Sequence, residues 1–295
     1  MAKIAKRINV SCYRIYNVDL PEFPFIIEMY NDNVYVAEYK SKHSLSDEEY
    51  SEWLDLSLQT IQKVLNVSEN KIFLKLRERQ KGVNQYAKLN QEKNEFIVDE
   101  NNLRFIVNLS DYIDVGLFLD HRITRAMVKE WSANKKVLNL FAYTGSFTVY
   151  VAAGNAQQIT TVDMSKTYLT WAKRNLTYNK LYDDKIHSFI QEDVLQYLND
   201  TKQKEFDLII LDPPTFSNSK RMQDTLDIQR DHVKILNQCL QMLSNDGVIV
   251  FSTNYRNFEL DTTQLTIKSI KDITQVTTPF DFEGKLKRKC YYITK

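Results

Sequence analysis

Three acidic residues in the second half of the chain follow short apolar runs that predict strands. They are Asp163, Asp193 and Asp212, and the runs before them are Ile159–Val162, His187–Ile190 and Phe206–Leu211. Because the carboxyl ends of parallel strands meet at one edge of an open α/β sheet, we expect the three carboxylates to lie together at that edge. Carboxylates there can accept hydrogen bonds from a ribose diol or an adenine amino group. Their spacing therefore predicts a cofactor that contains a nucleoside.

The turn after the predicted strand Val137–Phe141 is a second feature that suits a cofactor. Small residues, Ala142–Gly145, lead from that strand into a helical pattern over about Ser146–Ala153. Backbone N–H groups at a helix N-terminus can bind a carboxylate or a phosphate. A dinucleotide site would carry G-x-G-x-x-G here, whereas this turn has only Gly145. In Rossmann-like methyltransferases that use S-adenosylmethionine (SAM), the places of the three acids bind the ribose, the adenine amino group and the methyl-transfer centre. The ordered acids, with two prolines after Asp212, resemble that pattern and favour SAM.

Residues beside these acids indicate how SAM would be held. Met164, next to Asp163, can cover one face of the adenine. The N–H groups of Tyr143, Thr144 and Gly145 are expected to face the methionine carboxylate. No residue of this set calls for a metal ion.

Asp212 begins the sequence Asp-Pro-Pro-Thr-Phe, which we expect at the methyl-transfer centre. The stiff turn Pro213-Pro214 would expose backbone carbonyls beside the sulfonium carbon. Phe216 can stack on an entering base, although an aromatic residue here also fits a role as core filler. Thr215 separates Phe216 from the prolines, whereas in amino-methyltransferases an aromatic residue follows the prolines directly.

Basic residues gather in two segments that suit contacts with RNA phosphates. The first, LKLRERQKG, contains Arg77, Arg79 and Lys81 and is followed by an aromatic residue. The second contains Lys220 and Arg221. Phosphate contacts and base stacking use such residues, but a solvated loop rim would have the same composition.

The composition argues against several other classes of protein. The chain has 295 residues, a net charge of +1 and no apolar run near the roughly 20 residues that cross a bilayer. Its N-terminus, MAKIAKRINV, lacks the apolar core of a signal peptide, so we expect a cytoplasmic protein. Cys12, Cys239 and Cys290 are far apart and odd in number, which argues against a disulfide framework and a cysteine-based metal site.

Residues 1–112 predict a small α+β module. Its expected elements are a hairpin of Phe25–Met29 with Val34–Tyr39, a helix over Asp47–Leu65, and a hairpin of Glu95–Val98 with Leu103–Val107. Alternating apolar residues favour the strands, and the helix has an apolar stripe at helical spacing.

Residues 113–295 alternate strands with helices. This order predicts an α/β, Rossmann-like class I methyltransferase fold with a mostly parallel seven-stranded sheet. Towards the end of the chain we expect a helix over about Asp261–Ile270, then strands over about Ile273–Thr277 and Lys289–Ile293.

Several long strings carry a resemblance to a known family. They are GLFLDHR, NLFAYTGSFT, TVDMSKTYLTWAKRNL and LDPPTFSNSKRM. From about Cys12 to its end, the chain resembles the C-terminal, RlmK half of RlmKL, a family of bifunctional bacterial 23S ribosomal RNA guanine methyltransferases. The other half of that family methylates guanine N2 and carries an RNA-binding module, and it has no counterpart here. The chain is therefore expected to be either an excised domain or a natural stand-alone form.

The resemblance implies an activity, a site and a partner. The activity is transfer of a methyl group from SAM to guanine N7, and the partner is 23S ribosomal RNA or a precursor of the large ribosomal subunit. The implied cofactor site includes Phe118, Asp120, Arg122, Phe141, Tyr143, Thr144, Gly145, Asp163, Met164, Asp193 and Asp212. Residues 1–112 would line an RNA groove beside the catalytic domain, 113–295.

Three related functions are also compatible with the sequence. A 5-methylcytosine methyltransferase needs a cysteine nucleophile, which in related enzymes follows Phe-Ser on the fifth strand, whereas here Thr253 follows Phe251-Ser252. No cysteine of the chain is expected near a strand-end motif. The second function is a guanine-N2 methyltransferase of the same fold, and the third is a non-catalytic RNA-binding module. Guanine N7 carries a free lone pair at neutral pH, so its methylation needs no general base.

Overall fold

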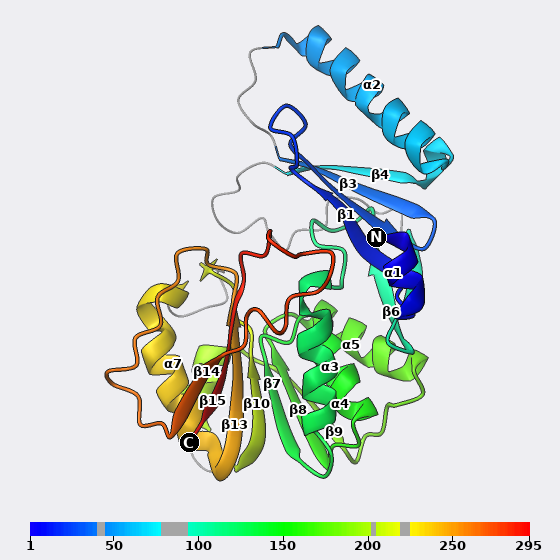
Figure 1. The fold of residues 1–295 in the computed structure, drawn as a ribbon. Helices are drawn as coiled ribbons and strands as arrows, with labels where there is room; N and C mark the ends of the chain where they lie inside the picture. The colour runs from blue at the N-terminus through cyan, green and yellow to red at the C-terminus, as the bar shows by residue number, and fades with distance from the viewer. Residues whose placement is uncertain (40–44, 78–93, 202–204, 219–224) are drawn as a thin grey trace. The chain divides into compact units, whose positions relative to one another are not determined.

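The structure is a computed structural model of the chain (Figure 1). It describes residues 1–39, 45–77, 94–201, 205–218 and 225–295, with only the backbone described for Tyr39 and Arg77. The chain divides into two compact units. Unit 1 contains Met1–Glu100 and Val107–Val115, and unit 2 contains Asn101–Ile106 and Gly116–Lys295. None of the helices in the described ranges combines the length and apolar character needed to span a bilayer.

Unit 1 is built on a four-stranded sheet with the order β1-β2-β3-β4. Its strands are β1 (Cys12–Asn17), β2 (Phe25–Tyr30), β3 (Asn33–Tyr39) and β4 (Ile72–Arg77), and its helical elements are α1 (Ala2–Arg7), α2 (Asp47–Leu65) and η1 (Glu69–Lys71). β2 and β3 form the predicted hairpin, in which Tyr30 pairs with Asn33. β3 and β4 are parallel, so α2 makes the crossover between them.

Helix α2 begins where the sequence predicts because Ser46 caps it. The Ser46 hydroxyl accepts a hydrogen bond from the Glu49 N–H at 3.3 Å, and the Glu49 carboxylate accepts one from the Ser46 N–H at 2.7 Å. This reciprocal pair satisfies two N–H groups that the first helical turn leaves open. Trp53 and Leu58 on the apolar face of α2 pack against the buried core of the sheet.

The second predicted hairpin is formed by β5 (Glu95–Glu100) and β6 (Leu103–Asn108). Asn101 and Asn102 between them both have positive φ, 53° and 65°. Two successive left-handed residues are the mark of a type I′ hairpin turn, which asparagine tolerates better than most residues. The division between the two units runs through this hairpin.

Unit 2 contains the predicted seven-stranded sheet, in the order β14-β15-β13-β10-β7-β8-β9. The strands are β7 (Lys136–Leu140), β8 (Gln158–Asp163), β9 (His187–Gln191), β10 (Phe206–Leu211), β13 (Leu243–Thr253), β14 (Ser269–Asp272) and β15 (Lys289–Thr294). The five strands β7, β8, β9, β10 and β13 are mutually parallel. β15 runs antiparallel to its neighbours β13 and β14. The Rossmann-like prediction is therefore confirmed.

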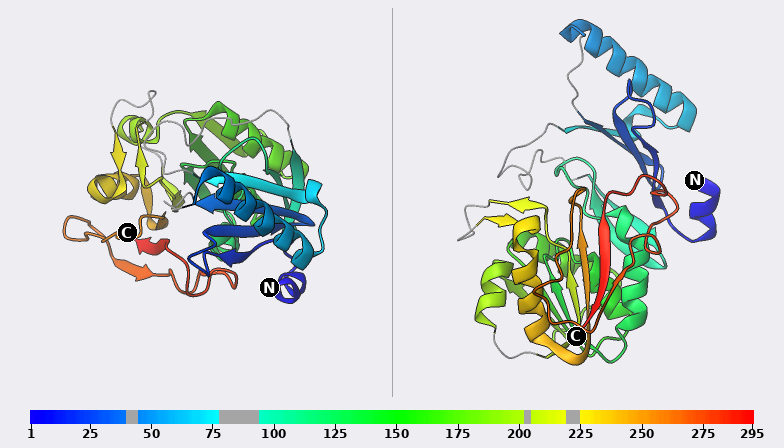
Figure 2. Two further views of the ribbon diagram at one scale, coloured as in Figure 1. Left: turned by 90° about the horizontal axis from the view of Figure 1, so that it is seen from above. Right: turned by 60° about the vertical axis from the view of Figure 1, so that its left-hand side comes forward.

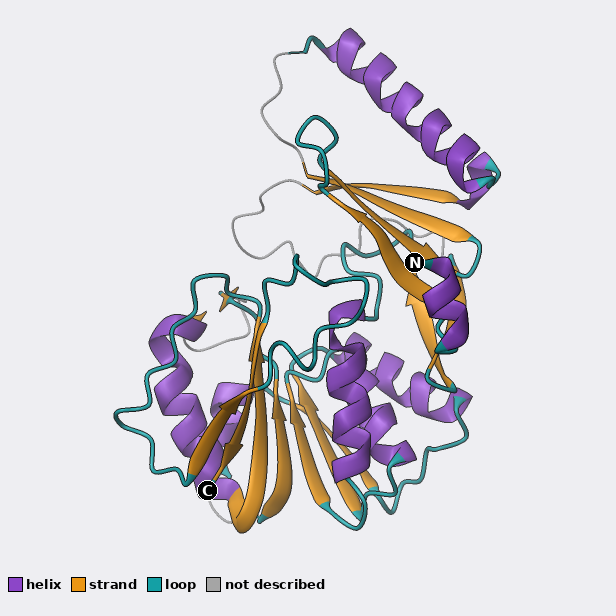
Figure 3. Ribbon diagram, in the orientation of Figure 1, coloured by secondary structure: helices purple, strands orange, loops and turns teal. Residues whose placement is uncertain are grey.

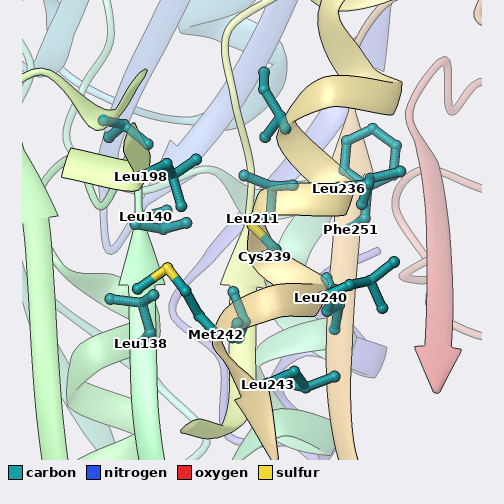
Figure 4. Close-up of a cluster of buried hydrophobic side chains, with 14 of the residues drawn as sticks. Leu138, Leu140, Leu198, Leu211, Leu236, Cys239, Leu240, Met242, Leu243 and Phe251 are labelled. Atoms are coloured by element: carbon teal, nitrogen blue, oxygen red, sulfur yellow. The ribbon is translucent and has the colours of Figure 1, made fainter. Parts of the chain in front are cut away.

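Helices cover both faces of this sheet (Figures 1 and 2). They are η3 (Leu119–His121), α3 (Arg122–Trp131), α4 (Ser146–Ala153), α5 (Lys166–Tyr178), α6 (Val194–Asp200) and α7 (Ile228–Met242). Side chains of α3 and α4 pack on one face, around Leu208 and Ile210. Side chains of α6 and α7 pack on the other face, where Leu138 and Leu211 meet Leu236 in the largest apolar cluster (Figure 4).

Two expectations for the last part of the chain are wrong. Asp261–Ile270 is not a helix: residues 254–268 form a loop (Figure 3). The Asp261 carboxylate accepts hydrogen bonds from both the N–H and the hydroxyl of Thr263, at 2.9 and 2.7 Å. Such local side-chain bonds compete with helical bonds.

The strand expected over Ile273–Thr277 lies earlier, as β14. Residues from Ile273 onward turn instead, because the Thr277 N–H and hydroxyl both donate to the Ile273 carbonyl, at 3.0 and 2.8 Å. The terminal strand expected over Lys289–Ile293 is confirmed as β15.

The turn between β7 and α4 has an unusual backbone. Phe141, Tyr143 and Gly145 all have positive φ, at 55°, 50° and 71°. Each such residue other than glycine costs about 1–3 kcal/mol, so surrounding contacts must hold the turn. A Cβ built on Gly145 would lie 2.4 Å from the Cβ of Ala172 on α5. The close approach of the turn to α5 therefore requires glycine at this position.

Replacing Gly145 by alanine should destabilise unit 2 strongly. The left-handed conformation would cost about 1–2 kcal/mol, and the overlap with Ala172 would add about 1–3 kcal/mol. Gly284→Ala is a matched control, because Gly284 has the same φ of 71° with no atom within 4 Å of the added Cβ. Thermal denaturation of both variants measures the difference. Equal shifts in the midpoint would contradict a tight contact at Gly145.

Candidate active site

The strand register brings the predicted acids to one edge of the sheet. Leu140, the last residue of β7, pairs with Val162 on β8 and with Leu211 on β10. Asp163 and Asp212 each follow that row by one residue, and Asp193 follows β9. The sheet order reverses between β7 and β10, where open α/β sheets bind their ligands.

Asp163 is half-buried and shapes the turn after β7. One carboxylate oxygen accepts the Tyr143 N–H at 2.8 Å, and the other accepts the Ser165 N–H at 2.8 Å. Burial raises the pKa of Asp163 to about 6, against these two hydrogen bonds, which lower it. Each oxygen keeps a further lone pair, so the carboxylate can still accept hydroxyl groups of a ribose.

Two N–H groups of the turn have acceptors within the protein. That of Tyr143 is used by Asp163, and that of Gly145 donates to the Ala142 carbonyl at 2.9 Å. Both groups stabilise the turn itself in the described structure, and the contact of the turn with a methionine carboxylate stays a prediction. The alternation of left-handed residues folds these two N–H groups back onto protein acceptors.

Thr144 lies at the buried side of the same turn. Its hydroxyl donates to the Gly116 carbonyl at 2.6 Å, and its own carbonyl accepts the side-chain amide of Asn175 at 3.0 Å. Thr144 and Asn175 are fully buried. Both residues therefore fix the turn, and neither presents its side chain to a ligand.

Aromatic rings form one wall of the site. The rings of Phe118 and Tyr143 are 5.2 Å apart between centroids, and Tyr143 meets Tyr168 edge to face at 4.6 Å. Phe118 is 36% exposed, so one part of its ring is open to a ligand. The structure therefore brings together Phe118, Tyr143 and, through the Tyr143 N–H, Asp163.

A cluster of buried charges lies behind the strand ends. Asp120 has a carboxylate oxygen 3.3 Å from Nε of Arg288, whose side chain is fully buried. His121 has its Nε2 3.4 Å from Asp212 and 4.0 Å from Asp120. On its other oxygen, Asp212 accepts the Ser252 hydroxyl at 2.6 Å. The His121 ring therefore lies near the carboxylates of both Asp120 and Asp212.

Arg122 has a partner inside the protein. Its guanidinium makes a two-bond ion pair with Asp281, at 2.8 and 3.3 Å, and both side chains are buried. Its charge is also 5.5 Å from the centre of the Phe280 ring. Arg122 therefore holds the loop before β15 through its ion pair with Asp281, and it is not among the exposed residues of the site.

The remaining predicted residues take various positions. Asp193 caps α6 by accepting the Leu195 N–H at 3.0 Å. Phe141 packs against the apolar cluster of Figure 4, and Met164 is half-buried beside Asp163.

The sequence Asp-Pro-Pro-Thr-Phe after β10 contains both buried and exposed residues. Pro213 is buried, Pro214 is half-buried, and Phe216 is 49% exposed. Phe216 begins β11 (Phe216–Ser217), which pairs with β12 (Leu226–Asp227). Phe216 is therefore not core filler.

The predicted RNA contacts are basic side chains in two segments of the chain. Arg79, Lys81, Lys220 and Arg221 lie outside the described residues, as does the side chain of Arg77 at the end of β4.

Sequence reasoning missed His121, Ser252 and Arg288. His121 stands inside the string GLFLDHR, and Ser252 directly precedes Thr253, so each had a local signal. Arg288 had none, because its partner Asp120 is 168 residues away.

Comparisons with known proteins bear on this arrangement. The family model for S-adenosylmethionine-dependent methyltransferases matches residues 55–284. Ribosomal RNA large subunit methyltransferase K from Neisseria meningitidis serogroup B is 45% identical over 295 residues, which are 99% of this chain and 83% of that protein. This chain belongs to the methyltransferase K family. The resemblance seen in the sequence is thereby confirmed.

Longer members of the methyltransferase K family carry a second part. Ribosomal RNA large subunit methyltransferase K/L from Alteromonas mediterranea is 47% identical over 291 residues, covering 98% of this chain and 41% of that protein. The chain thus spans less than half of such relatives. Among solved structures, SMU.776, crystallised as a complex with SAH, matches the whole chain and 78% of its own chain at a TM-score of 0.80 and 25% identity.

SAM is the cofactor of this chain. The described residues suit it, because Asp163 offers acceptors for ribose hydroxyls and Phe118 offers an open aromatic face. When bound, the cofactor supplies the methyl group from its sulfonium.

Cofactor affinity should depend on the charge of Asp163. An ionised carboxylate is a stronger acceptor for ribose hydroxyls than a protonated one, and the pKa of Asp163 is raised to about 6 by burial. Above that pH the carboxylate is ionised and binding is full; below it, affinity should fall by up to about tenfold per pH unit. Titration calorimetry with SAH from pH 8 to pH 5 measures this.

Asp163→Asn is the matched control for the pH titration. It should bind SAH about tenfold more weakly at pH 7.5, since one acceptor is lost, and its affinity should not change between pH 8 and pH 5. If wild type and Asp163→Asn respond to pH alike, Asp163 does not hold the ribose.

Proposed function

We propose that this chain transfers a methyl group from SAM to N7 of a guanine in 23S ribosomal RNA, free or within a precursor of the large subunit. The ribosomal RNA substrate is supported by the name of the 45% identical relative, a ribosomal RNA large subunit methyltransferase. The choice of N7 follows the resemblance of the sequence to the RlmK half, and N7 is an acceptor that needs no base beside the methyl group.

The chemistry of guanine N7 is consistent with such a site. Its lone pair lies in the ring plane and is unprotonated at neutral pH, so the enzyme needs only to align N7, methyl carbon and sulfur and to exclude water. In an RNA helix N7 faces a deep, narrow groove, so the target guanine must be unpaired or drawn out of the stack. Phe216, half-exposed after the two prolines, is available to stack on that base.

Methylation at guanine N2 would require removal of a proton, unlike methylation at N7. An amino nitrogen must lose a proton, which calls for a free acceptor beside the methyl group. In the described structure, Asp212 already accepts the Ser252 hydroxyl at 2.6 Å, and its other oxygen is 3.4 Å from His121 Nε2. The choice of N7 over N2 therefore rests on the resemblance of the sequence to the RlmK half.

Methylation at cytosine C5 would require a reactive thiolate. Contrary to expectation, one cysteine does lie near a strand-end motif: Cys290 pairs in register with Ser252. However, Cys290 is fully buried, and burial raises its pKa to about 11. Burial also raises the pKa of Cys239, to about 12. Neither thiol is suited to nucleophilic attack.

Residues 1–112 and 113–295 would have different roles in this proposal. Residues 113–295 form the catalytic domain in this proposal, and residues 1–112 line a groove for RNA, with Arg77, Arg79 and Lys81 binding phosphates. Lys220 and Arg221, close in sequence to Phe216, would bind phosphates near the target base. A guanine-N2 methyltransferase part, suggested by the longer K/L relatives, is a further proposed partner.

The product should be N7-methylguanine. Unmodified 23S ribosomal RNA incubated with labelled SAM should become cleavable by borohydride and aniline, which break the chain at N7-methylguanine. Asp212→Ala should reduce label transfer by about 100-fold or more, as is common when a group that positions the reacting atoms is removed. Label recovered in 5-methylcytosine or N2-methylguanine would contradict N7.

A thiol should not take part in the reaction. Cys290→Ala should leave the turnover number within about threefold of wild type, because a neutral buried thiol is a poor nucleophile. Cys239→Ala, equally buried but on α7, controls for the loss of packing. Loss of turnover in Cys290→Ala alone, with normal thermal stability, would indicate covalent catalysis.

Unit 1 should contribute to RNA affinity and not to cofactor affinity. Arg77→Ala with Arg79→Ala should weaken RNA binding and reduce the slope of log affinity against log salt by about 1–2 units, since each lost phosphate contact accounts for slightly less than one. The affinity for SAH should not change.

The control for this variant removes the same charge elsewhere in unit 1. Lys63 lies on the last turn of α2. Lys71 ends η1, directly before β4, and is paired with Asp32 at 2.6 Å. Lys63→Ala with Lys71→Ala should leave the salt slope near that of wild type. Equal slopes for the two double variants would show that the segment has no specific role.

A further inference from the structure

His121 is a buried polar residue without a conventional role in the fold. It ends η3, is 1% exposed, and within the described part of the chain neither ring nitrogen has a hydrogen-bond partner. A buried polar group without a partner destabilises the fold, so its presence calls for a functional explanation. Its ring also meets Phe147 edge to face at 5.4 Å, so packing alone is the competing explanation.

The surroundings of the ring decide where its proton lies. Nε2 is 3.4 Å from Asp212 and 4.0 Å from Asp120, and both neighbours are acceptors. A neutral imidazole has one N–H, and this proton is most stable on the nitrogen that faces carboxylates. His121 is therefore a donor at Nε2, directed at the strand-end acids.

The ring is neutral at physiological pH. Burial lowers the pKa of His121 to about 3; the Asp212 carboxylate opposes this shift, while the charges of Arg288 and Arg125 add to it. The Asp120 carboxylate is engaged with Arg288, whose Nε is 3.3 Å away. Asp212 is accordingly the nearer acceptor for the His121 proton.

Asp212 is approached from both sides. The Ser252 hydroxyl donates to Oδ1 at 2.6 Å, while His121 Nε2 faces Oδ2. A second donor on the other oxygen would restrict rotation of the carboxylate more than the Ser252 hydroxyl does alone. The His121 contact is longer than a full hydrogen bond, and such contacts often shorten when substrates bind.

We propose that His121 is a positioning residue for methyl transfer, which acts by holding the Asp212 carboxylate in one orientation together with Ser252. The inference rests on the proposed place of Asp212 at the reaction centre, and it holds for any acceptor atom on the RNA. His121 takes up no proton in the reaction and touches neither substrate.

Two variants of His121 separate positioning from packing. In His121→Gln the amide nitrogen can reach the place of Nε2 and donate to Asp212, whereas His121→Leu fills similar space without a donor. His121→Leu should lower kcat by about 10- to 100-fold, as expected for losing a hydrogen bond to a charged group. The KM for SAM should change less than about threefold, and His121→Gln should recover most of kcat. Equal kcat for Leu and Gln would overturn the proposal.

A double-mutant cycle tests whether the effect passes through Asp212. In an Asp212→Asn background, His121→Leu should cause no further loss of kcat, because the carboxylate to be held is gone. An equal loss in both backgrounds would show that His121 acts independently. A wild-type kcat profile with an inflection near pH 6.5 that disappears in His121→Gln would instead indicate proton transfer, and would also overturn the proposal.

Nuclear magnetic resonance tests the same inference without RNA. The chain has four histidines, so the ring nitrogens of His121 can be assigned by comparison with His121→Gln. The spectrum should show a neutral ring with its proton on Nε2 down to pH 5, shifted in Asp212→Asn. A proton on Nδ1, or a charged ring at pH 7, would overturn the proposal. If wild type instead fails to methylate 23S ribosomal RNA while this signature is present, the proposed substrate is wrong and the positioning role stands.

Discussion

The turn after β7 is the constraint on which the site depends. Its backbone is strained, with Phe141 and Tyr143 in the left-handed region, and it persists because neighbouring elements hold it. Asp163 from β8 binds the Tyr143 N–H, and Asn175 from α5 binds the Thr144 carbonyl. The same carboxylate that suits a ribose therefore also fixes the turn. Cofactor binding and local backbone shape would be linked through this one side chain if Asp163 holds the ribose, as we predict.

Two buried ion pairs connect distant parts of unit 2. Asp120 and Arg122, two residues apart, pair with Arg288 and Asp281 on the segment that leads into β15. Removing one member of such a pair would leave an unpaired charge in a medium of low polarity, which costs about 3–5 kcal/mol. The pairs thus tie the start of unit 2 to its end, and they hold η3 so that His121 faces Asp212.

Local signals predicted most of the framework and the strand-end acids. The strands β7, β8 and β10 are short apolar runs, and the acids after them were predicted to share an edge because parallel register allows no other arrangement. The partners Asp281 and Arg288 were not predictable, because they lie 159 and 168 residues from the groups they bind. The helix expected over Asp261–Ile270 failed for the opposite reason, since Asp261 and Thr263 make short-range bonds that a periodic pattern does not reveal. Arg122 was placed with the cofactor by its motif, whereas its surroundings give it a structural partner.

The position of β15 has a consequence for biosynthesis. In sequence β14 comes first, yet it pairs only with β15, which lies between β14 and β13. Until β15 has been synthesised, β14 therefore has no neighbouring strand to pair with. Asp120 and Arg122 also lack their partners at that stage, because Arg288 has not been made and Asp281 follows β14 in the sequence. The last strand to be made, β15, is therefore the strand that joins β14 to the rest of the sheet. A nascent chain that already contains every strand-end acid would still lack the Asp120–Arg288 and Arg122–Asp281 pairs.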